Sequence, residues 1–394
     1  MATRTTTIRT TISEFGRFAD HSDADLTVDE LLCAYYDCRR RKRNTTNALK
    51  FETNLERNIM ALYRELMDGT YRPGMSICFV VTRPKPREVW AADFRDRIVH
   101  HLLYNRIADR FHNSFIADSC ACIPGRGTLY GATRLEHKIR SVTQNWSKRA
   151  YYLKLDMANF FVSIDKNILR KLLARKIGEP WAMWLADTIL FHDPRENVRI
   201  KGTPALLKLI PPYKSLFNQP PHLGLPIGNL SSQFFANVYL DALDQHVKHR
   251  IGARHYIRYV DDMVLLHESP EWLNRAKVEI GNFVKDRLGM ALNPRKTILQ
   301  PIARGVDFVG QIIKPWRRVL RRTTFENAVT ALSEKNGEGL MMSANSYLGL
   351  LRQSDHSHTA RARLARIALR KGHCVDGKFR KVFRKKNRVI CLTS

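Results

Sequence analysis

Two adjacent carboxylates, Asp261 and Asp262, are the residues of this chain most suited to chemistry. Short apolar, β-prone runs flank them, which predicts a strand, a tight turn and a second strand over residues 255–267. Neighbouring carboxylates repel each other unless a cation lies between them, and oxygen ligands of this kind suit Mg²⁺. Taken by itself, an Asp pair is more often a solvated turn, so the rest of the sequence must decide.

A third acid, Asp156, ends the apolar run of residues 150–156, which predicts a buried strand. An Asp at such a place is usually a helix cap. A neighbouring hairpin could instead bring Asp261 to it, and the two would then hold two Mg²⁺ ions about 4 Å apart, the arrangement for in-line phosphoryl displacement. Such chemistry also needs cations around the triphosphate. We therefore expect Asp156, Asp261 and Asp262 to be catalytic and to bind metal.

The composition favours a folded protein with a polyanionic partner. The 394 residues are 44% hydrophobic, and 66 Lys and Arg against 37 Asp and Glu give a net charge of +29. That charge favours nucleic acid first and an anionic membrane second. No apolar run reaches the length of about 20 residues that a membrane span needs, and residues 1–11 lack a secretory core. We expect a cytoplasmic protein without membrane contact. The seven Cys show no zinc spacing and are expected to be reduced thiols.

Hydrophobic periodicity predicts an irregular mixture of helices and strands. Asp165 is expected to cap the helix that begins at Lys166, and Phe160 to lie in the core. Residues 203–227 are rich in Pro and are expected to be irregular. A mixture without βαβ alternation predicts α+β lobes. The predicted helices are 26–67, 93–113, 166–194, 230–250, 271–288 and the segment from 347 onward, and the predicted strands are 77–92, 150–156, 255–267 and 306–322.

Two basic segments are candidate phosphate contacts. Arg39, Arg40 and Arg41 open a run of five basic residues, for which a phosphate contact and a solvated face are equally favoured. Between Arg361 and Arg388 there are twelve Lys and Arg against one Asp, a density that favours a surface for a nucleic-acid backbone.

The order of the motifs resembles that of the reverse transcriptases over residues 55–350. The run ending in Asp156 resembles polymerase motif A, and Tyr259-Val260-Asp261-Asp262 resembles motif C. The resemblance implies an α+β right-hand polymerase with fingers, a palm of antiparallel sheet plus helices, and a small helical thumb. Further matching segments are 224–233 for motif B, 289–297 for motif D, 308–310 for the primer grip, and 85–87, 95–97 and 124–127 for the fingers. The implied divisions are an N-terminal helical extension (1–50), fingers (51–150), a palm with a fingers-side helical insertion around 166–222 (151–305), and primer grip, thumb and basic tail (306–394).

The resemblance also implies roles for individual residues. Asp156, Asp261, Asp262 and the backbone carbonyl of Met157 would bind two Mg²⁺ ions, for which Mn²⁺ could substitute. Phe161 falls where a ring blocks the ribose 2′-hydroxyl and so selects deoxynucleotides. The other implied nucleotide-binding residues are Lys85, Arg95, Arg97, Arg126, Ile227, Gly228, Gln233 and Lys296. The implied primer and template contacts are Tyr259, Phe308, Gly310, Arg39, Arg40 and Arg41.

Motif B points to a subfamily. Retroviral and group II intron enzymes usually carry Gln-Gly in this motif, with Ser-Pro further along, whereas this chain has Ile227-Gly228 and Ser232-Gln233. This variant is similar to the reverse transcriptases of diversity-generating retroelements. So are residues 212–217 and 346–349. Those bacterial or phage enzymes copy a template-repeat RNA into cDNA with errors at adenines, which diversifies a target gene. The implied partners are template RNA, cDNA or primer, deoxynucleoside triphosphates and a small basic helical-bundle accessory protein. We hypothesise that Ile227, which cannot hydrogen-bond, relaxes checking of the new base pair.

Other functions stay open. A related reverse transcriptase acting in phage defence shares much of this motif B, and a genomic template repeat with a variable repeat would separate the two. A group II intron maturase is less favoured because no DNA-binding or endonuclease extension follows the expected thumb. A non-catalytic nucleic-acid binder on a polymerase scaffold is disfavoured by the intact Asp156, Asp261 and Asp262.

Overall fold

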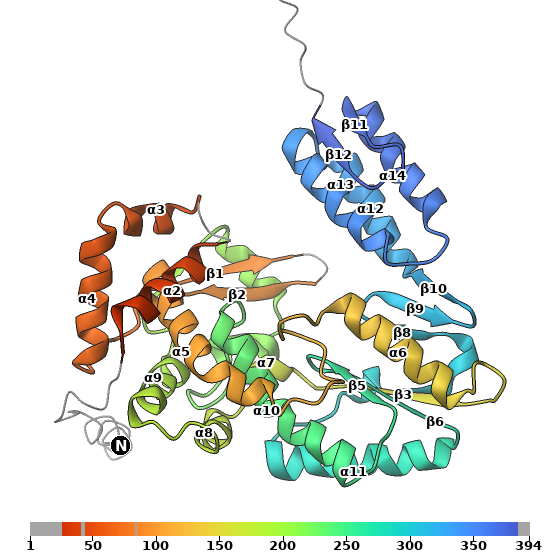
Figure 1. Ribbon diagram of the computed structural model, residues 1–394, viewed down its shortest axis with the longest axis horizontal. Helices are drawn as coiled ribbons and strands as arrows, with labels where there is room; N and C mark the ends of the chain where they lie inside the picture. The colour runs from red at the N-terminus through yellow and green to blue at the C-terminus, as the bar shows by residue number, and fades with distance from the viewer. Residues whose placement is uncertain (1–25, 41–43, 83–84, 385–394) are drawn as a thin grey trace, which may run out of the picture. The chain divides into compact units, whose positions relative to one another are not determined.

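The computed structural model describes residues 26–40, 44–82 and 85–384 (Figure 1). The chain forms two compact units, each built from three stretches of sequence. Unit 1 comprises residues 1–123, 156–252 and 278–294, and unit 2 comprises 124–155, 253–277 and 295–394. No helix in the described part of the chain is both long and apolar enough to cross a membrane.

Unit 1 is mainly helical. Helix α10 is buried on nearly all sides, which makes it the centre of this unit. Helix α5 packs against both α2 and α10 and begins where the Asp93 side chain accepts a hydrogen bond from the Arg95 amide. The helices are α2 (Val28–Arg39), α3 (Thr46–Glu52), α4 (Leu55–Met67), α5 (Phe94–His112), α7 (Phe160–Ser163), α8 (Lys166–Ala174), α9 (Pro180–Phe191), α10 (Leu230–His249) and the second half of α11 (Pro270–Leu288).

A three-stranded sheet completes unit 1. Strands β1 (Ser76–Val81) and β2 (Arg87–Ala91) are antiparallel, and β4 (Val198–Ile200) is parallel to β1. The Pro-rich stretch that follows β4 holds only the short 3₁₀ helices η1 (Pro204–Leu209), η2 (Pro212–Lys214) and η3 (Leu216–Asn218). The predicted irregularity of residues 203–227 is therefore confirmed.

Unit 2 is built on a four-stranded sheet in the order β5-β6-β3-β7. Helix α6 (Thr128–Val142) packs against β5 and β6. The strands are β3 (Tyr151–Asp156), β5 (Tyr256–Tyr259), β6 (Asp262–His267) and β7 (Ile298–Pro301). Strand β3 begins in unit 2, and its last residue, Asp156, belongs to unit 1. The short 3₁₀ helices η4 (Pro294–Lys296) and η5 (Ile302–Arg304) flank β7.

The C-terminal part of unit 2 is a small sheet followed by a helical bundle. Strands β8 (Val306–Phe308), β9 (Gln311–Lys314) and β10 (Arg317–Leu320) form the sheet. The bundle buries Leu332, Leu340 and Leu348 among its core residues. Its elements are the helices α12 (Arg322–Glu334), α13 (Gly337–Leu351) and α14 (His358–Arg370), and the hairpin of β11 (His373–Val375) and β12 (Val382–Arg384).

The α+β fold class is confirmed, and two predictions need correction. The segment 26–67 is helical as expected and contains three helices, whereas 166–194 is split into α8 and α9 around Gly178. Phe160 and Phe161 lie in the short helix α7, so they do not alternate as strand residues would. Asp165 caps α8 as expected, with its carboxylate accepting from the amides of Asn167 and Ile168. Helices α6, α7 and α12, most of α13, and strands β4 and β7 lie outside the segments predicted from hydrophobic periodicity, and strands β11 and β12 were not predicted.

Candidate active site

The acid pair lies on a tight hairpin of unit 2. Tyr259 pairs with Asp262, which leaves Val260 and Asp261 as the two turn residues. Val260 has φ 55°, a conformation that is unfavourable for a β-branched residue. The fully buried Arg258 donates from Nη1 to the Val260 carbonyl at 2.9 Å. A buried guanidinium thus holds the turn in its strained form and fixes the direction in which both carboxylates leave the sheet.

Lys154 places a positive charge beside the second acid. Its Nζ lies 3.1 Å from Asp262 Oδ2 and donates to the Asp307 carbonyl at 3.0 Å. The Lys154 side chain is only 12% exposed, so the ion pair has little contact with water. Sequence reasoning missed Lys154. Its spacing was the available signal, because residues two apart on a strand share a face, as Lys154 and Asp156 do on β3.

In unit 1, Asp156 is buried and held by the segment that resembles motif D. The Asp156 carbonyl accepts from the Asn293 amide at 2.8 Å, and Asn293 Nδ2 lies 3.5 Å from Asp156 Oδ1. Met157 forms a β-bridge with Leu292. The extended backbone of residues 291–293 therefore fixes where strand β3 delivers its terminal acid. Asn293 is a second residue that the sequence did not single out.

The segment that resembles motif B is fastened to the residues around Phe161. Leu225 donates its amide to the Phe161 carbonyl at 2.8 Å, and Gly224 donates to the Ile164 carbonyl at 2.8 Å. Gly224 has φ 90°, and a Cβ there would lie 2.6 Å from Leu216 Cδ1. Phe160 is buried and Phe161 is half-buried, with their rings 5.2 Å apart. The half-buried ring of Phe161 is the one expected to block the ribose 2′-hydroxyl.

The same segment then docks on β2. The Ile227 carbonyl accepts from the Trp90 amide at 2.7 Å, and the Asn229 Oδ1 accepts from the Ala92 amide at 3.1 Å. Gly228 has φ 131°, and a Cβ on it would lie 2.6 Å from the Trp90 carbonyl oxygen. Any side chain larger than glycine would push the two backbones apart. Gln233, on α10, is exposed and accepts a weak contact from Cys122 Sγ at 3.5 Å.

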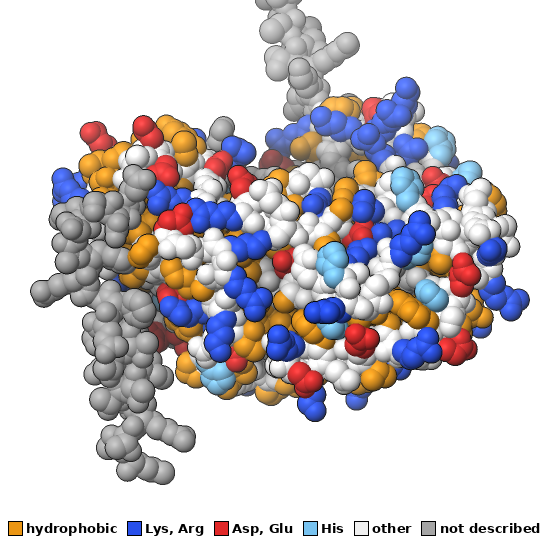
Figure 2. Space-filling view, turned by 60° about the horizontal axis from the view of Figure 1, so that its bottom comes forward, with side chains coloured by type: hydrophobic (Ala, Val, Ile, Leu, Met, Phe, Trp, Pro, Cys, Tyr) orange, Lys and Arg blue, Asp and Glu red, His pale blue; other side chains and the backbone are white. Residues whose placement is uncertain are grey.

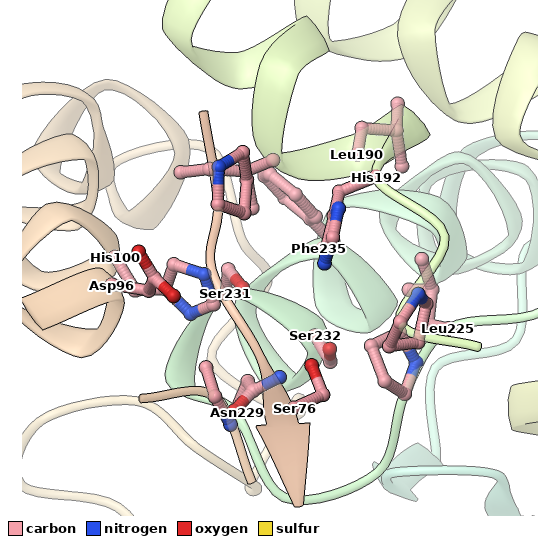
Figure 3. Close-up of a pocket in the computed structure, with 15 residues that line it drawn as sticks. Ser76, Asp96, His100, Leu190, His192, Leu225, Asn229, Ser231, Ser232 and Phe235 are labelled. Carbon is pink, nitrogen blue, oxygen red and sulfur yellow. Dashed lines mark hydrogen bonds between the residues drawn. The ribbon is translucent and has the colours of Figure 1, made fainter. Parts of the chain in front are cut away.

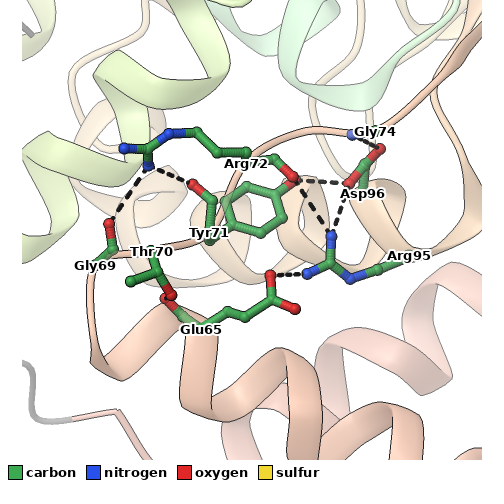
Figure 4. Close-up of polar contacts among 8 residues, drawn as sticks. All are labelled: Glu65, Gly69, Thr70, Tyr71, Arg72, Gly74, Arg95 and Asp96. Carbon is green, nitrogen blue, oxygen red and sulfur yellow. Dashed lines mark hydrogen bonds and ion pairs between the residues drawn. The ribbon is translucent and has the colours of Figure 1, made fainter.

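Two of the arginines predicted to bind nucleotide, Arg95 and Arg97, make contacts within unit 1, and Figure 4 shows those of Arg95. Arg95 forms an ion pair with Glu65 and lies over the Tyr71 ring at 5.2 Å. Asp96 accepts from the Tyr71 hydroxyl and from the Gly74 amide, both at 2.9 Å. Burial raises the pKa of Asp96. Arg97 donates to the Ala92 carbonyl at 2.8 Å. These contacts brace the start of α5.

The remaining predicted contacts are dispersed over both units. Lys85 and Lys296 are exposed, on the β1–β2 loop of unit 1 and in η4 of unit 2 respectively. Arg126 lies over the Tyr130 ring at 5.9 Å in unit 2. Phe308 is buried with its ring 6.5 Å from that of Tyr259, and Gly310 follows it in the β8–β9 turn with φ 85°.

The two described arginines of the basic run 39–43 form ion pairs. Arg39 Nε donates to Glu52 Oε1 at 2.5 Å, and Arg40 Nη2 donates to Asp37 Oδ1 at 2.9 Å. Arg41 lies outside the described residues. Both described arginines therefore have acidic partners within unit 1, and their assignment to phosphate stays a prediction.

A small cavity in unit 1 is lined by buried polar groups (Figure 3). Ser231 Oγ lies 3.2 Å from His100 Nδ1. Burial lowers the pKa of His100 to about 3, so this imidazole is neutral at physiological pH. The cavity volume of about 20 Å³ suits a water molecule and is far too small for a nucleotide. This cavity is part of the packing between α5 and α10.

The donor set of the acid hairpin decides whether a metal would fit. Among the described residues no group of three or more His, Cys, Asp or Glu side chains is close enough to hold an ion. The Asp261 and Asp262 carboxylates are both half-buried on one hairpin, and carboxylate oxygens are the ligands that Mg²⁺ prefers. The hairpin pair alone therefore fits a divalent cation chemically, with Lys154 as the cation already paired with one of its oxygens.

Comparison with known proteins identifies one family. The family model described as "Reverse transcriptase (RNA-dependent DNA polymerase)" matches residues 82–313, more than half of the 394 residues. The chain is also similar to the putative COX1/OXI3 intron 2 protein of Saccharomyces cerevisiae, at 20% identity over 57% of this chain and 30% of the relative. The match thus spans less than a third of that relative's length.

Two solved structures are similar at low identity. One is telomerase from Candida albicans in complex with a TWJ fragment of telomeric RNA, with a TM-score of 0.45 and 11% identity over 75% of this chain and 56% of that one. The other is apo telomerase from Candida tropicalis truncated from its C-terminal domain, with a TM-score of 0.46 and 12% identity over 63% of this chain and 55% of that one.

Proposed function

The chain belongs to the reverse transcriptase family, and from that premise we propose that it is an RNA-directed DNA polymerase that copies a template RNA into cDNA. The observation that carries the proposal is the hairpin of residues 256–267, which presents two carboxylates on a turn held from beneath by a buried arginine. The hairpin lies within the matched range 82–313.

We propose that Asp156 joins Asp261 and Asp262 as the third metal-binding carboxylate, with the Met157 carbonyl as a further ligand. Sheet order supports this, because β3, which ends at Asp156, is the neighbour of β6, which begins at Asp262. When bound, two Mg²⁺ ions would lower the pKa of the primer 3′-hydroxyl and neutralise the leaving pyrophosphate. The chain's own part is to hold these oxygens in place, through Arg258 on the hairpin and Asn293 behind Asp156.

Substrate selection is proposed to rest on Phe161 and on the motif B loop. The half-buried ring of Phe161 would stand where a ribose 2′-hydroxyl must pass, and the loop beside it is fixed by the Leu225 and Gly224 amides. Lys85, Arg95, Arg97, Arg126 and Lys296 would surround the triphosphate. The division into fingers, palm and thumb, with the bundle α12–α14 as the thumb, is part of the same proposal.

We further propose the diversity-generating role, in which cDNA made from a template repeat carries errors at adenines. The support is the side chain of Ile227, which has no hydrogen-bonding group, on a backbone fixed by its own carbonyl to Trp90. A polar residue there could test the geometry of the new base pair, and Ile227 cannot. If Ile227→Gln leaves adenine misincorporation unchanged, this explanation is wrong. The small basic accessory protein is a proposed partner.

The deciding experiment is Mg²⁺-dependent extension of a DNA primer on an RNA template, with the products sequenced. Wild type is compared with the Asp261→Ala/Asp262→Ala double variant. Extension by wild type alone, with errors opposite template adenines, supports both proposals. Faithful extension keeps the polymerase and favours the phage-defence alternative. No extension by wild type, even with the genomic template RNA and the neighbouring accessory protein, would overturn the polymerase and favour a non-catalytic nucleic-acid binder.

A further inference from the structure

Unit 2 has a second candidate site, at the end of β3 opposite Asp156. A hollow of about 430 Å³ lies at Tyr151, the first residue of β3, between the loop after α6 and the turn between β9 and β10. That volume lies within the range of small-ligand pockets. Tyr151 and Asp156 are five residues apart on one strand, which corresponds to roughly 17 Å. The hollow is therefore separate from the carboxylates.

The β9–β10 turn exposes a tryptophan in an unfavourable backbone conformation. Lys314 pairs with Arg317, so the turn residues are Pro315 and Trp316. Trp316 has φ 61°, where glycine is the favoured residue, and 64% of it is exposed. Arg140 lies over its ring at 6.0 Å. A strained and solvent-exposed indole contributes nothing to a core, so a role in contact with a ligand explains it better.

The loop on the other side of the hollow is also unusual. Gln144, Asn145 and Trp146 all have positive φ, at 45°, 56° and 72°. The indole Nε1 of Trp146 is buried and has no hydrogen-bond partner among the described residues. Such a donor is costly unless something pairs with it. Both aromatic side chains therefore sit in backbone that would be more stable with another residue.

The charge of the hollow is uniformly positive. Lys148, Arg149 and Arg304 line it and are exposed, and none of the described lining residues is Asp or Glu. The nearby Glu136 is already paired with Arg140 and with Arg318. Lys and Arg also outnumber acids over the face shown in Figure 2. What distinguishes the hollow is its combination of exposed cations with indole rings, which is the chemistry of single-stranded nucleic-acid binding.

We propose that this hollow binds single-stranded RNA away from the catalytic carboxylates. One base stacks on Trp316, and Lys148, Arg149 and Arg304 contact the flanking phosphates. The choice of RNA over other polyanions rests on the proposed function, since the template is RNA. Such a site would hold the template strand at a second point along its length.

The test measures binding of labelled oligouridylate by fluorescence anisotropy, in EDTA and without nucleotides, so that no polymerisation takes part. Trp316→Gly removes the ring and suits the positive φ, so the hairpin should stay folded. Its matched control is Met342→Ala, another exposed apolar residue of unit 2, 65% exposed. The charge variant is Lys148→Ala/Arg149→Ala/Arg304→Ala, and its control is the exposed Arg275→Ala on α11. Thermal unfolding of every variant checks the fold.

We expect Trp316→Gly to weaken binding roughly 5- to 150-fold, the loss of one stacked base. The triple charge variant should reduce the slope of log affinity against log salt by about 0.7 for each phosphate that is no longer neutralised. Both controls should bind as wild type does. Wild-type affinity in both site variants would overturn the proposal, as would an acidic peptide that occupies the hollow while these variants still bind RNA normally.

The outcomes separate this proposal from the proposed function. If primer extension fails but RNA binding still depends on Trp316, the polymerase proposal is wrong and the RNA-binding proposal stands. If primer extension is normal but RNA binding does not depend on Trp316, the polymerase proposal stands and the RNA-binding proposal is wrong.

Discussion

Two hairpins of unit 2 each hold a non-glycine turn residue at positive φ, but the strain is stabilised in different ways. In the β5–β6 turn Val260 is held at positive φ by a fully buried arginine, and in the β9–β10 turn Trp316 is held at positive φ with its ring in solvent. The first strain is stabilised from inside, which suits side chains that must point in one direction. The strain at Trp316 is not stabilised from inside, which suits an exposed side chain that binds a ligand. The first turn is the one proposed to bind metal, and the second is the one proposed to bind RNA.

The largest expected effect comes from the acids themselves. Asp261 is a residue of the turn, whereas Asp262 begins β6, where it lies opposite Tyr259 and forms an ion pair with Lys154. We therefore expect Asp261→Asn to lower primer extension at least about 100-fold, and Asp262→Asn to lower it less. Single-turnover extension with saturating primer-template measures both. Equal losses would show that the Lys154 pair does not distinguish the two acids.

The second prediction concerns the stability that Arg258 gives to the acid turn. Arg258→Met removes the charged donor to the half-buried Val260 carbonyl, and the loss of a hydrogen bond to a charged group costs about 1.5–3 kcal/mol of unfolding free energy. Urea unfolding followed by circular dichroism gives this value. The control is Arg317→Met, an exposed arginine beside the other turn, which should be neutral within about 0.5 kcal/mol. A stable Arg258→Met protein would mean that the acid turn does not need its internal support.

Lys154 provides a subtler test of the metal proposal. Its Nζ competes with a cation for Asp262 Oδ2, so Lys154→Met should raise the negative potential at the hairpin. We expect the half-saturating Mg²⁺ concentration for extension to fall roughly threefold, since a partly exposed ion pair is worth up to about 1 kcal/mol. An increase instead would indicate that Lys154 orients Asp262 rather than competing for it. Lys154→Arg, which keeps the charge, is the matched control.

The smallest effect concerns the strain itself. Val260→Gly and Trp316→Gly each relieve a positive φ that costs about 1–2 kcal/mol in a residue with a side chain, and each adds the entropy cost of glycine, about 0.5–1 kcal/mol. Both variants should therefore change the unfolding free energy by less than about 1 kcal/mol, measured as above. Only Val260→Gly should slow primer extension, because its turn carries the acids. If Trp316→Gly also slows extension on a short template, the β9–β10 turn contributes to catalysis and the two turns do not have separate roles.

The sequence predicted the acid hairpin well because its information is local. Short apolar, β-prone runs on both sides of Asp261 and Asp262 are enough to indicate strand, turn and strand. The contacts that support it come from elsewhere in the chain and could not be predicted. Lys154 lies more than 100 residues before Asp262, and a fully buried Arg258 contradicts the usual exposure of arginine. A Trp at a turn position that favours glycine also gives no local signal for the β9–β10 turn.

The division of the chain into two interleaved units has a consequence for how the protein is made. The polypeptide passes from one unit to the other after residues 123, 155, 252, 277 and 294. The sheet β5-β6-β3-β7 therefore remains incomplete on the ribosome until β7 has been synthesised, some 150 residues after β3. Contacts so distant in sequence form slowly. We expect nascent chains ending before β7 to expose an unpaired β3 edge, which makes them clients for chaperones and poor starting points for truncation.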